Sequence, residues 1–128
     1  IQPYSEVSYV YSLGDVSIVP CKKGFGGSAM PSKTWSIMAS GTPILASFDP
    51  ETDLEELVER HQIGLFSPAG DVDGLVNNIL ELYKKRDLCD TMGMNARNYV
   101  QDNLSREKCT QMYINVIREV VAGRMRRK

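Results

Sequence analysis

Short apolar runs alternate with segments of helical periodicity along most of the chain. The runs over residues 16–20, 44–47 and 63–66 are compact, apolar and bounded by proline, glycine or polar residues, so they predict three short strands. The run over residues 16–20 is rich in β-branched side chains, which is typical of a strand that is buried on both faces.

Apolar residues at helical spacing fill the segments between these runs and beyond them. A first short helix is expected from residue 5 to residue 13, with Gly14 as a left-handed C-cap. A second begins at Pro31 or Ser32 and ends at Gly41, and Asp71 is expected to cap the most regular helix. The remaining helices are predicted over residues 53–60, 72–83 and 87–103, the last in one or two pieces, and from residue 105 onward.

This alternation predicts an α/β domain, a three-layer Rossmann-like parallel sheet flanked by helices. Three strands are few for such a sheet, which usually has about five or six. The chain also starts at Ile1 in what reads as the tail of an element already under way, so we expect a domain truncated at its N-terminus. Residues 1–128 then form a partial domain, with an α/β core over residues 1–104 and a C-terminal helix and basic tail over residues 105–128.

Composition and charge narrow the class of protein. The 15 Lys and Arg residues nearly balance 16 Asp and Glu residues, so we expect no nucleic-acid partner. No apolar run approaches the roughly 20 residues of a membrane-spanning helix. The three cysteines are widely spaced, which predicts reduced thiols in a cytoplasmic protein and no metal site.

A glycine-rich loop follows the first predicted strand. Ligands of open parallel sheets bind beyond the carboxyl ends of the strands, which is where this loop lies. Gly24, Gly26 and Gly27 let the backbone approach a ligand closely, and a helix that starts near Ser32 directs N–H groups toward the same place. These features favour an anion such as a diphosphate, with Lys33 either as an additional cation or facing solvent. A lone glycine-rich loop is not specific by itself.

Acidic residues gather after the second predicted strand. Asp49, Glu51, Asp53, Glu55 and Glu56 follow the end of a strand, where they could bind a sugar hydroxyl. Acidic side chains in a first turn also stabilise the N-terminus of a helix, and that structural role is the expected one.

Residues 24–47 resemble the signature region of family 4 glycosyltransferases of the GT-B fold. The resemblance is carried by Pro-Ser-Lys over residues 31–33 and by Ala-Ser-Gly-Thr-Pro over residues 39–43, a pattern typical of bacterial enzymes of surface polysaccharide synthesis. Residues 13–20 are similar to the family's strand before this loop, and residues 64–71 to its later Gly-Asp segment before a helix. The ordered match covers about residues 4–103 and is more specific than any single motif.

The resemblance implies the partial C-terminal domain of a retaining glycosyltransferase, which binds a UDP-sugar or GDP-sugar while a separate N-terminal domain receives the acceptor. Family members as a rule need no metal or other cofactor, and they stabilise the leaving diphosphate with helix N-termini and basic side chains. Carried over by position, the sugar lies near residues 26–30 and residue 36 meets the ribose, while no catalytic residue is assigned. The implied donor-binding residues are Gly26, Gly27, Ser28, Ser32, Lys33, Thr34 and Ser36.

Two positions depart from the family pattern. The family has glutamates eight positions apart, one near the sugar and one on the ribose, where this chain has Ser28 and Ser36. Losing the charge-assisted ribose contact weakens donor binding by about 1.5 to 3 kcal/mol. We therefore expect the isolated chain to be inactive and a longer protein to carry the transferase activity. The alternative is a non-catalytic scaffold or partner module of the same fold. A flavodoxin-like or receiver-like α/β domain is disfavoured because no acidic cluster follows the first strand.

The implied partners are the nucleotide-sugar donor, the missing N-terminal domain and a lipid-linked or glycan acceptor. The surface exposed by truncation can also support an oligomer. The expected location is the cytoplasm. Residues 124–128 form a basic tail that either contacts anionic lipid at the inner face of the membrane or is a solvated terminus.

Overall fold

Strands and helices alternate along the chain in the computed structural model, which describes residues 3–28 and 30–125. The predictions for Ile1 and for the last residues of the basic tail, 126–128, lie outside the described residues. The strands are β1 (Ser17–Pro20), β2 (Ile44–Phe48) and β3 (Gly64–Pro68). Two 3-10 turns cover Tyr4–Glu6 and Gly26–Ser28. The helices are α1 (Val7–Ser12), α2 (Lys33–Ala39), α3 (Asp53–His61), α4 (Val72–Lys84), α5 (Arg86–Asn103) and α6 (Arg106–Met125).

The three strands form a parallel sheet with β2 in the centre. The strand order is β1-β2-β3. Ile44 at the start of β2 lies opposite Ser17 of β1 on one side and opposite Gly64 of β3 on the other. The predicted fold class, an α/β domain with a parallel sheet flanked by helices, is confirmed.

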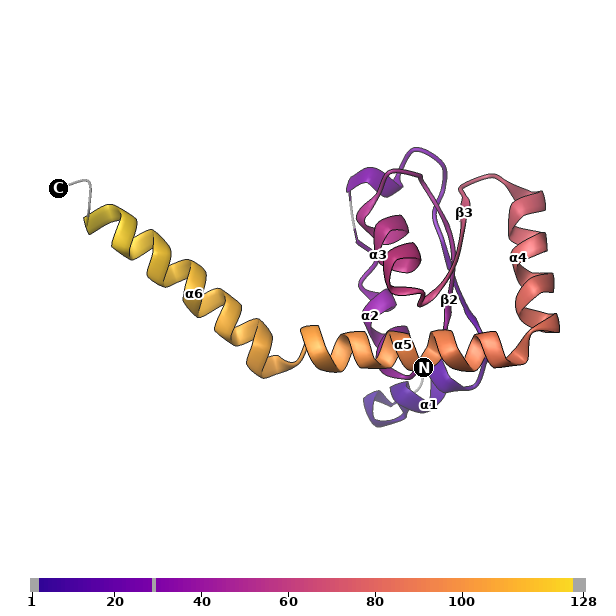
Figure 1. Ribbon diagram of the computed structural model, residues 1–128, viewed down its shortest axis with the longest axis horizontal. Helices are drawn as coiled ribbons and strands as arrows, with labels where there is room; N and C mark the ends of the chain where they lie inside the picture. The colour runs from indigo at the N-terminus through magenta and orange to yellow at the C-terminus, as the bar shows by residue number, and fades with distance from the viewer. Residues whose placement is uncertain (1–2, 29, 126–128) are drawn as a thin grey trace.

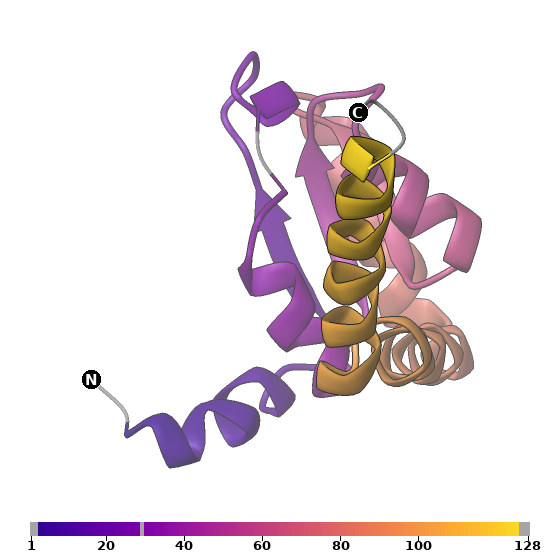
Figure 2. The same ribbon diagram turned by 90° about the vertical axis from the view of Figure 1, so that its left-hand side faces the viewer.

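Helices cover both faces of this sheet. The α2 and α3 helices lie on one face, α4 lies on the other, and α5 crosses near the amino ends of the strands (Figure 1). The arrowheads of the strands point toward one edge, with α1 beyond the opposite edge (Figure 2). The α6 helix leaves this body as a separate rod (Figure 1). None of the helices between residues 3 and 125 combines the length and hydropathy that crossing a bilayer requires.

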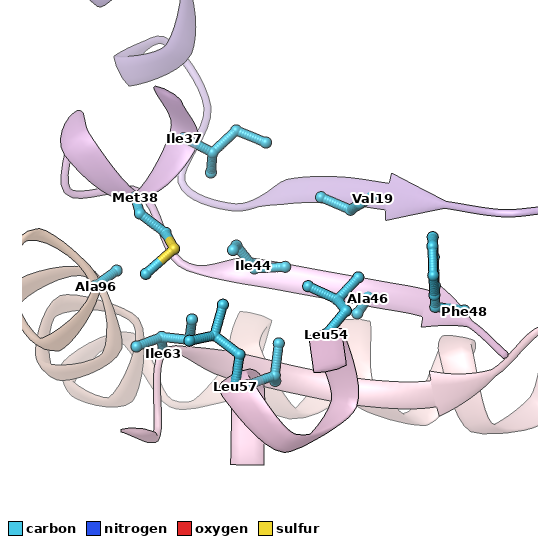
Figure 3. Close-up of a cluster of buried hydrophobic side chains, with 11 residues drawn as sticks. Val19, Ile37, Met38, Ile44, Ala46, Phe48, Leu54, Leu57, Ile63 and Ala96 are labelled. Atoms are coloured by element: carbon cyan, nitrogen blue, oxygen red, sulfur yellow. The ribbon is translucent and has the colours of Figure 1, made fainter. Parts of the chain in front are cut away.

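The main hydrophobic core lies between the sheet and the helices α2, α3 and α5 (Figure 3). Ile44, Ala46 and Phe48 contribute alternate side chains of β2, because successive residues of a strand point to opposite faces. A smaller cluster on the α4 side contains Leu82 and Met92. The other members of the main core are Val19, Ile37, Met38, Leu54, Leu57, Val58, Ile63 and Ala96.

β1 is an edge strand, and the prediction that it is buried on both faces is wrong. Val19 packs into the main core, but Ile18 on the opposite face is 52% exposed. The α4 helix packs over β2 and β3 on that face. An apolar hollow of about 290 Å³ therefore remains between Ile18 and the α4 residues Ile79 and Tyr83. A run of β-branched residues predicts that a strand forms. It does not predict which helices pack over the two faces of that strand.

Most of the predicted helix ends are confirmed. Asp71 caps α4, since its Oδ1 accepts a hydrogen bond from the Gly74 N–H at 2.9 Å. Gly41 follows α2 with a φ of 77°, as a left-handed C-terminal glycine does. The left-handed C-cap predicted at Gly14 is wrong, because α1 ends earlier and Leu13 is its C-cap in the right-handed region, with a φ of −69°.

The α5 helix packs on the turn between α2 and β2 through backbone contact. A Cβ atom at Gly93 would lie 2.2 Å from the carbonyl oxygen of Gly41 and 3.5 Å from the side chain of Pro43. Glycine inside a helix costs about 1 kcal/mol relative to alanine. Here that cost is offset by the close approach of the α5 backbone to the backbone at Gly41, which only glycine at position 93 permits.

Replacing Gly93 by alanine should therefore destabilise the fold. We expect Gly93→Ala to lower the free energy of unfolding by about 1 to 3 kcal/mol, because the added methyl overlaps with backbone atoms that have little room to move. The measurement is urea unfolding followed by circular dichroism. The matched control is Gly123→Ala in α6, where nothing lies within 4 Å of the new Cβ. Equal midpoints for the two variants would contradict this packing of α5.

Candidate functional site

The three strands end at one edge of the sheet. Parallel pairing places the last residues of the strands, Pro20, Phe48 and Pro68, on the same side. The glycine-rich loop leaves β1 at this edge, and the loops to α3 and α4 leave β2 and β3 beside it (Figure 1). This is the edge at which open parallel sheets bind ligands.

Asp49 ties the glycine-rich loop to the end of β2. Its Oδ1 accepts a hydrogen bond from the Gly24 N–H at 2.9 Å, and its Oδ2 accepts one from the Gly26 N–H at 2.7 Å. These two hydrogen bonds, with a smaller effect from the positive charge of Lys23, hold the pKa of Asp49 below its ordinary value. Two amides of the loop are thus satisfied by a carboxylate of the chain itself.

Gly26 has the least room of the loop glycines. It is buried, and a Cβ atom there would lie 2.7 Å from the ring of Phe48 and 3.0 Å from the Cβ of Asp49. Gly27, by contrast, is exposed and has nothing within 4 Å of a Cβ position. Only glycine therefore fits at position 26, because the loop lies so close to the end of β2 there.

A hollow of about 270 Å³ lies between the glycine-rich loop and the start of α3. Gly26, Gly27 and Met30 form one wall, and residues 51–54 form the other. Glu51 turns the chain toward α3 in the left-handed region, with a φ of 58°. Within residues 3–28 and 30–125, no three His, Cys, Asp or Glu side chains come together as a metal site.

The predicted donor-binding residues fall into two groups. Gly26 and Gly27 line the hollow, and Ser28 completes their 3-10 turn, although its side chain lies outside the described part of the chain. The second group lies on α2 and at its N-cap, away from the lining of the hollow. It consists of Ser32, Lys33, Thr34 and Ser36.

One backbone N–H at the start of α2 already has a hydrogen-bond partner within the chain. The Thr34 N–H donates to the carbonyl oxygen of Pro31 at 3.0 Å. The Thr34 side chain is fully buried, and its hydroxyl has no hydrogen-bond partner among the described residues. Ser32 is the N-cap without a capping hydrogen bond from its side chain, and Lys33 and Ser36 are exposed. The exposed polar or cationic side chains at α2 and its N-cap are therefore those of Ser32, Lys33 and Ser36.

Sequence reasoning missed the role of Asp49. The acidic residues after β2 are expected in the first turn of a helix, and Asp53, Glu55 and Glu56 do lie there. Asp49 lies before α3 and bonds instead to residues 23 and 25 positions earlier in the chain. A pattern of neighbouring residues cannot predict a contact between residues more than 20 positions apart in the sequence.

A larger hollow, of about 580 Å³, lies at the opposite edge of the sheet. Gly41, Gly93 and Arg97 contribute to its lining, together with Asp15 and Arg86, which form an exposed ion pair at 2.9 Å. It opens beside the amino ends of the strands. Choosing the site by volume alone would therefore select the amino edge, whereas open parallel sheets bind ligands at the carboxyl edge.

Two curated proteins are similar to nearly the whole chain, while no family model matches it. The probable glycosyltransferase WbjE of Pseudomonas aeruginosa is 26% identical over 120 residues, which is 94% of this chain and 30% of that protein. The putative colanic acid biosynthesis glycosyl transferase WcaI of Escherichia coli strain K12 is 27% identical over 119 residues, which is 92% of this chain and 28% of that protein. The chain thus spans less than a third of the length of these relatives.

A solved structure has the same fold over most of the chain. Sucrose-phosphate synthase from Thermosynechococcus elongatus, a GT-B enzyme, aligns with a TM-score of 0.74 and 26% identity. The alignment covers 89% of this chain and 27% of that one. The chain therefore has the fold of part of a GT-B glycosyltransferase, and the resemblance to family 4 glycosyltransferases that its motifs carry is confirmed.

Proposed function

We propose that the chain is the distal part of the donor-binding domain of a retaining glycosyltransferase of bacterial surface polysaccharide synthesis. The observation that carries this proposal is the similarity, over 92% and 94% of the chain, to two proteins named as glycosyltransferases. One of those names includes colanic acid biosynthesis. Because the chain spans less than a third of these relatives, the activity belongs to a longer protein.

The donor's diphosphate is assigned to the start of α2, which follows the glycine-rich loop in the chain. Negative charge grows on the diphosphate of a UDP-sugar or GDP-sugar as its bond to the sugar breaks, and catalysis depends on stabilising that charge. Lys33 is exposed at the start of α2 and supplies a cation there. The helix dipole adds a partial positive charge at the same end. In this proposal these groups act without a metal or other cofactor.

The sugar end of the donor is assigned to the hollow beside Gly26 and Gly27. The volume of about 270 Å³ is below the roughly 300 Å³ at which pockets for drug-sized ligands begin, so it suits one ring and not a whole donor. Ser36 lies farther along α2, where the proposal places the ribose. Its hydroxyl is a neutral group at a position where the family has a carboxylate.

Exposed apolar surfaces support a larger protein around this domain. Ile18 is exposed at the edge of the sheet, and α6 carries apolar side chains that are mostly exposed. Exposed apolar side chains gathered on one element are typical of an interface. We assign it to the rest of the glycosyltransferase, including the acceptor domain, in a protein of the cytoplasm that is peripheral at the inner membrane face. The exposed apolar residues of α6 are Met112, Tyr113, Ile114, Val116, Ile117, Val120 and Val121.

A second candidate function is a non-catalytic scaffold of the same fold. It is favoured by Ser28 and Ser36, which replace both carboxylates of the family pattern. Sugar transfer by the complete protein with both serines in place would exclude it.

Donor nucleotides should stabilise the isolated chain. At a concentration ten times the Kd, binding adds about 1.4 kcal/mol to the free energy of unfolding. For a domain of this size that raises the melting temperature by about 3 to 6 °C. Thermal-shift measurements with millimolar UDP, GDP and their sugars test this, and uridine and guanosine, which lack the diphosphate, should shift the transition less. The absence of any shift with the diphosphates would contradict donor binding by the chain.

Restoring the carboxylate on α2 should tighten donor binding. We expect Ser36→Glu to lower the Kd for the nucleotide sugar by about tenfold or more, because a hydrogen bond to a charged group is worth about 1.5 to 3 kcal/mol. Ser36 is exposed, so the core is not disturbed. Ser36→Gln has nearly the same size without the charge and should have a smaller effect in calorimetric titrations. Equal affinities for both variants and the wild type would place Ser36 away from the ribose.

A further inference from the structure

One carboxylate connects the two walls of the hollow beside the glycine-rich loop. The first wall contains Gly26, whose N–H donates to Asp49 at 2.7 Å. The second wall is the segment 51–54, which begins two residues after Asp49 in the chain. The second oxygen of the same carboxylate accepts from the Gly24 N–H at 2.9 Å. The distance between the walls therefore depends on this side chain.

The loop has a high entropic cost of ordering. Its glycines have more backbone conformations open to them in the unfolded chain than any other residue type. Its other hydrogen bonds are at its base or local: the Cys21 N–H donates to the Ser47 carbonyl at 2.8 Å, and the Phe25 N–H donates to the Lys22 carbonyl at 3.1 Å. Among the described residues, the bonds to Asp49 tie the tip of the loop to the rest of the fold.

We propose that Asp49 is a positioning residue for the sugar end of the donor. Asp49 holds the glycine-rich loop so that the hollow facing α3 keeps a volume suited to one sugar ring. This inference rests on the proposed function. Asp49 acts through the loop, because both of its carboxylate oxygens already accept hydrogen bonds from loop amides. Its effect is therefore on the part of the affinity that the sugar contributes, and not on the part that the nucleotide contributes.

The variants Asp49→Ala and Asp49→Asn test the contact, with Asp53→Asn as the matched control. Asp53 lines the same hollow and carries the same charge, but among the described residues it makes no hydrogen bond to the loop. In amide NMR spectra, the resonances of Gly24 and Gly26 should move and exchange faster with solvent in Asp49→Ala, and should change less in Asp49→Asn, which keeps one acceptor oxygen. In Asp53→Asn they should stay in place.

The pH dependence of these resonances gives a second test of the contact. In the wild type, the Gly24 and Gly26 resonances should titrate together with the Asp49 carboxylate, at a midpoint below the ordinary pKa of aspartate, because the amides bond to its charged form. The nearby positive charge of Lys23 acts in the same direction. Resonances that do not respond to the Asp49 variants or to this titration would overturn the proposal.

Donor titrations test the functional half of the proposal. We expect Asp49→Ala to weaken the binding of a UDP-sugar or GDP-sugar by roughly tenfold, because the hollow is no longer preorganised. The affinity for UDP or GDP alone should be unchanged. Asp73→Asn removes the same charge in the first turn of α4, outside the hollow, and should bind both ligands as the wild type does. Equal losses for sugar and nucleotide would indicate a general structural defect and would overturn the proposal, as would an unchanged affinity for the nucleotide sugar.

A wild type that binds neither nucleotides nor nucleotide sugars would show a different failure. That result would contradict the proposed function and, with it, the role of Asp49 in donor binding. Responses of Gly24 and Gly26 confined to the Asp49 variants would in that case identify the contact as purely structural. The two failures are thus distinguished by the ligand-free spectra.

Discussion

The parallel pairing of β2 with both of its neighbours is the constraint on which the candidate site depends. Ile44 and Ala46 are fully buried on one face of β2, and Leu45 is 1% exposed on the other. A strand so deeply buried must satisfy its backbone polar groups within the sheet, and β2 does so along both edges. That pairing places the carboxyl ends of three strands together. Loops that are far apart in sequence then meet, as Asp49 and Gly26 do.

The secondary structure could largely be predicted from local patterns because its causes are local. Asp71 is an N-cap residue before a regular amphipathic helix, and Gly41 takes a left-handed conformation that suits it. The exposure of β1 could not be predicted in this way. Whether a second helix covers Ile18 depends on where the sheet ends, and a run of β-branched residues carries no information on that.

The place of the candidate site could be predicted, but its internal contacts could not. A glycine-rich loop after a parallel strand lies at the ligand-binding edge by topology alone. The partners of its amides depend on a carboxylate more than 20 residues away, and the room at Gly26 depends on the ring of Phe48. The donor-binding roles of Lys33 and Ser36 stay predictions, since they concern a ligand and not the fold.

Mapping a bound nucleotide sugar by backbone NMR tests the central claim most directly, because the chain has hollows at opposite edges of its sheet. The account predicts that UDP-sugar or GDP-sugar shifts the resonances of residues 24–36 and 49–54 at the carboxyl edge. The resonances of Gly41, Gly93 and Arg97, which line the larger hollow at the amino edge, should not move. Shifts confined to the amino edge would contradict the account.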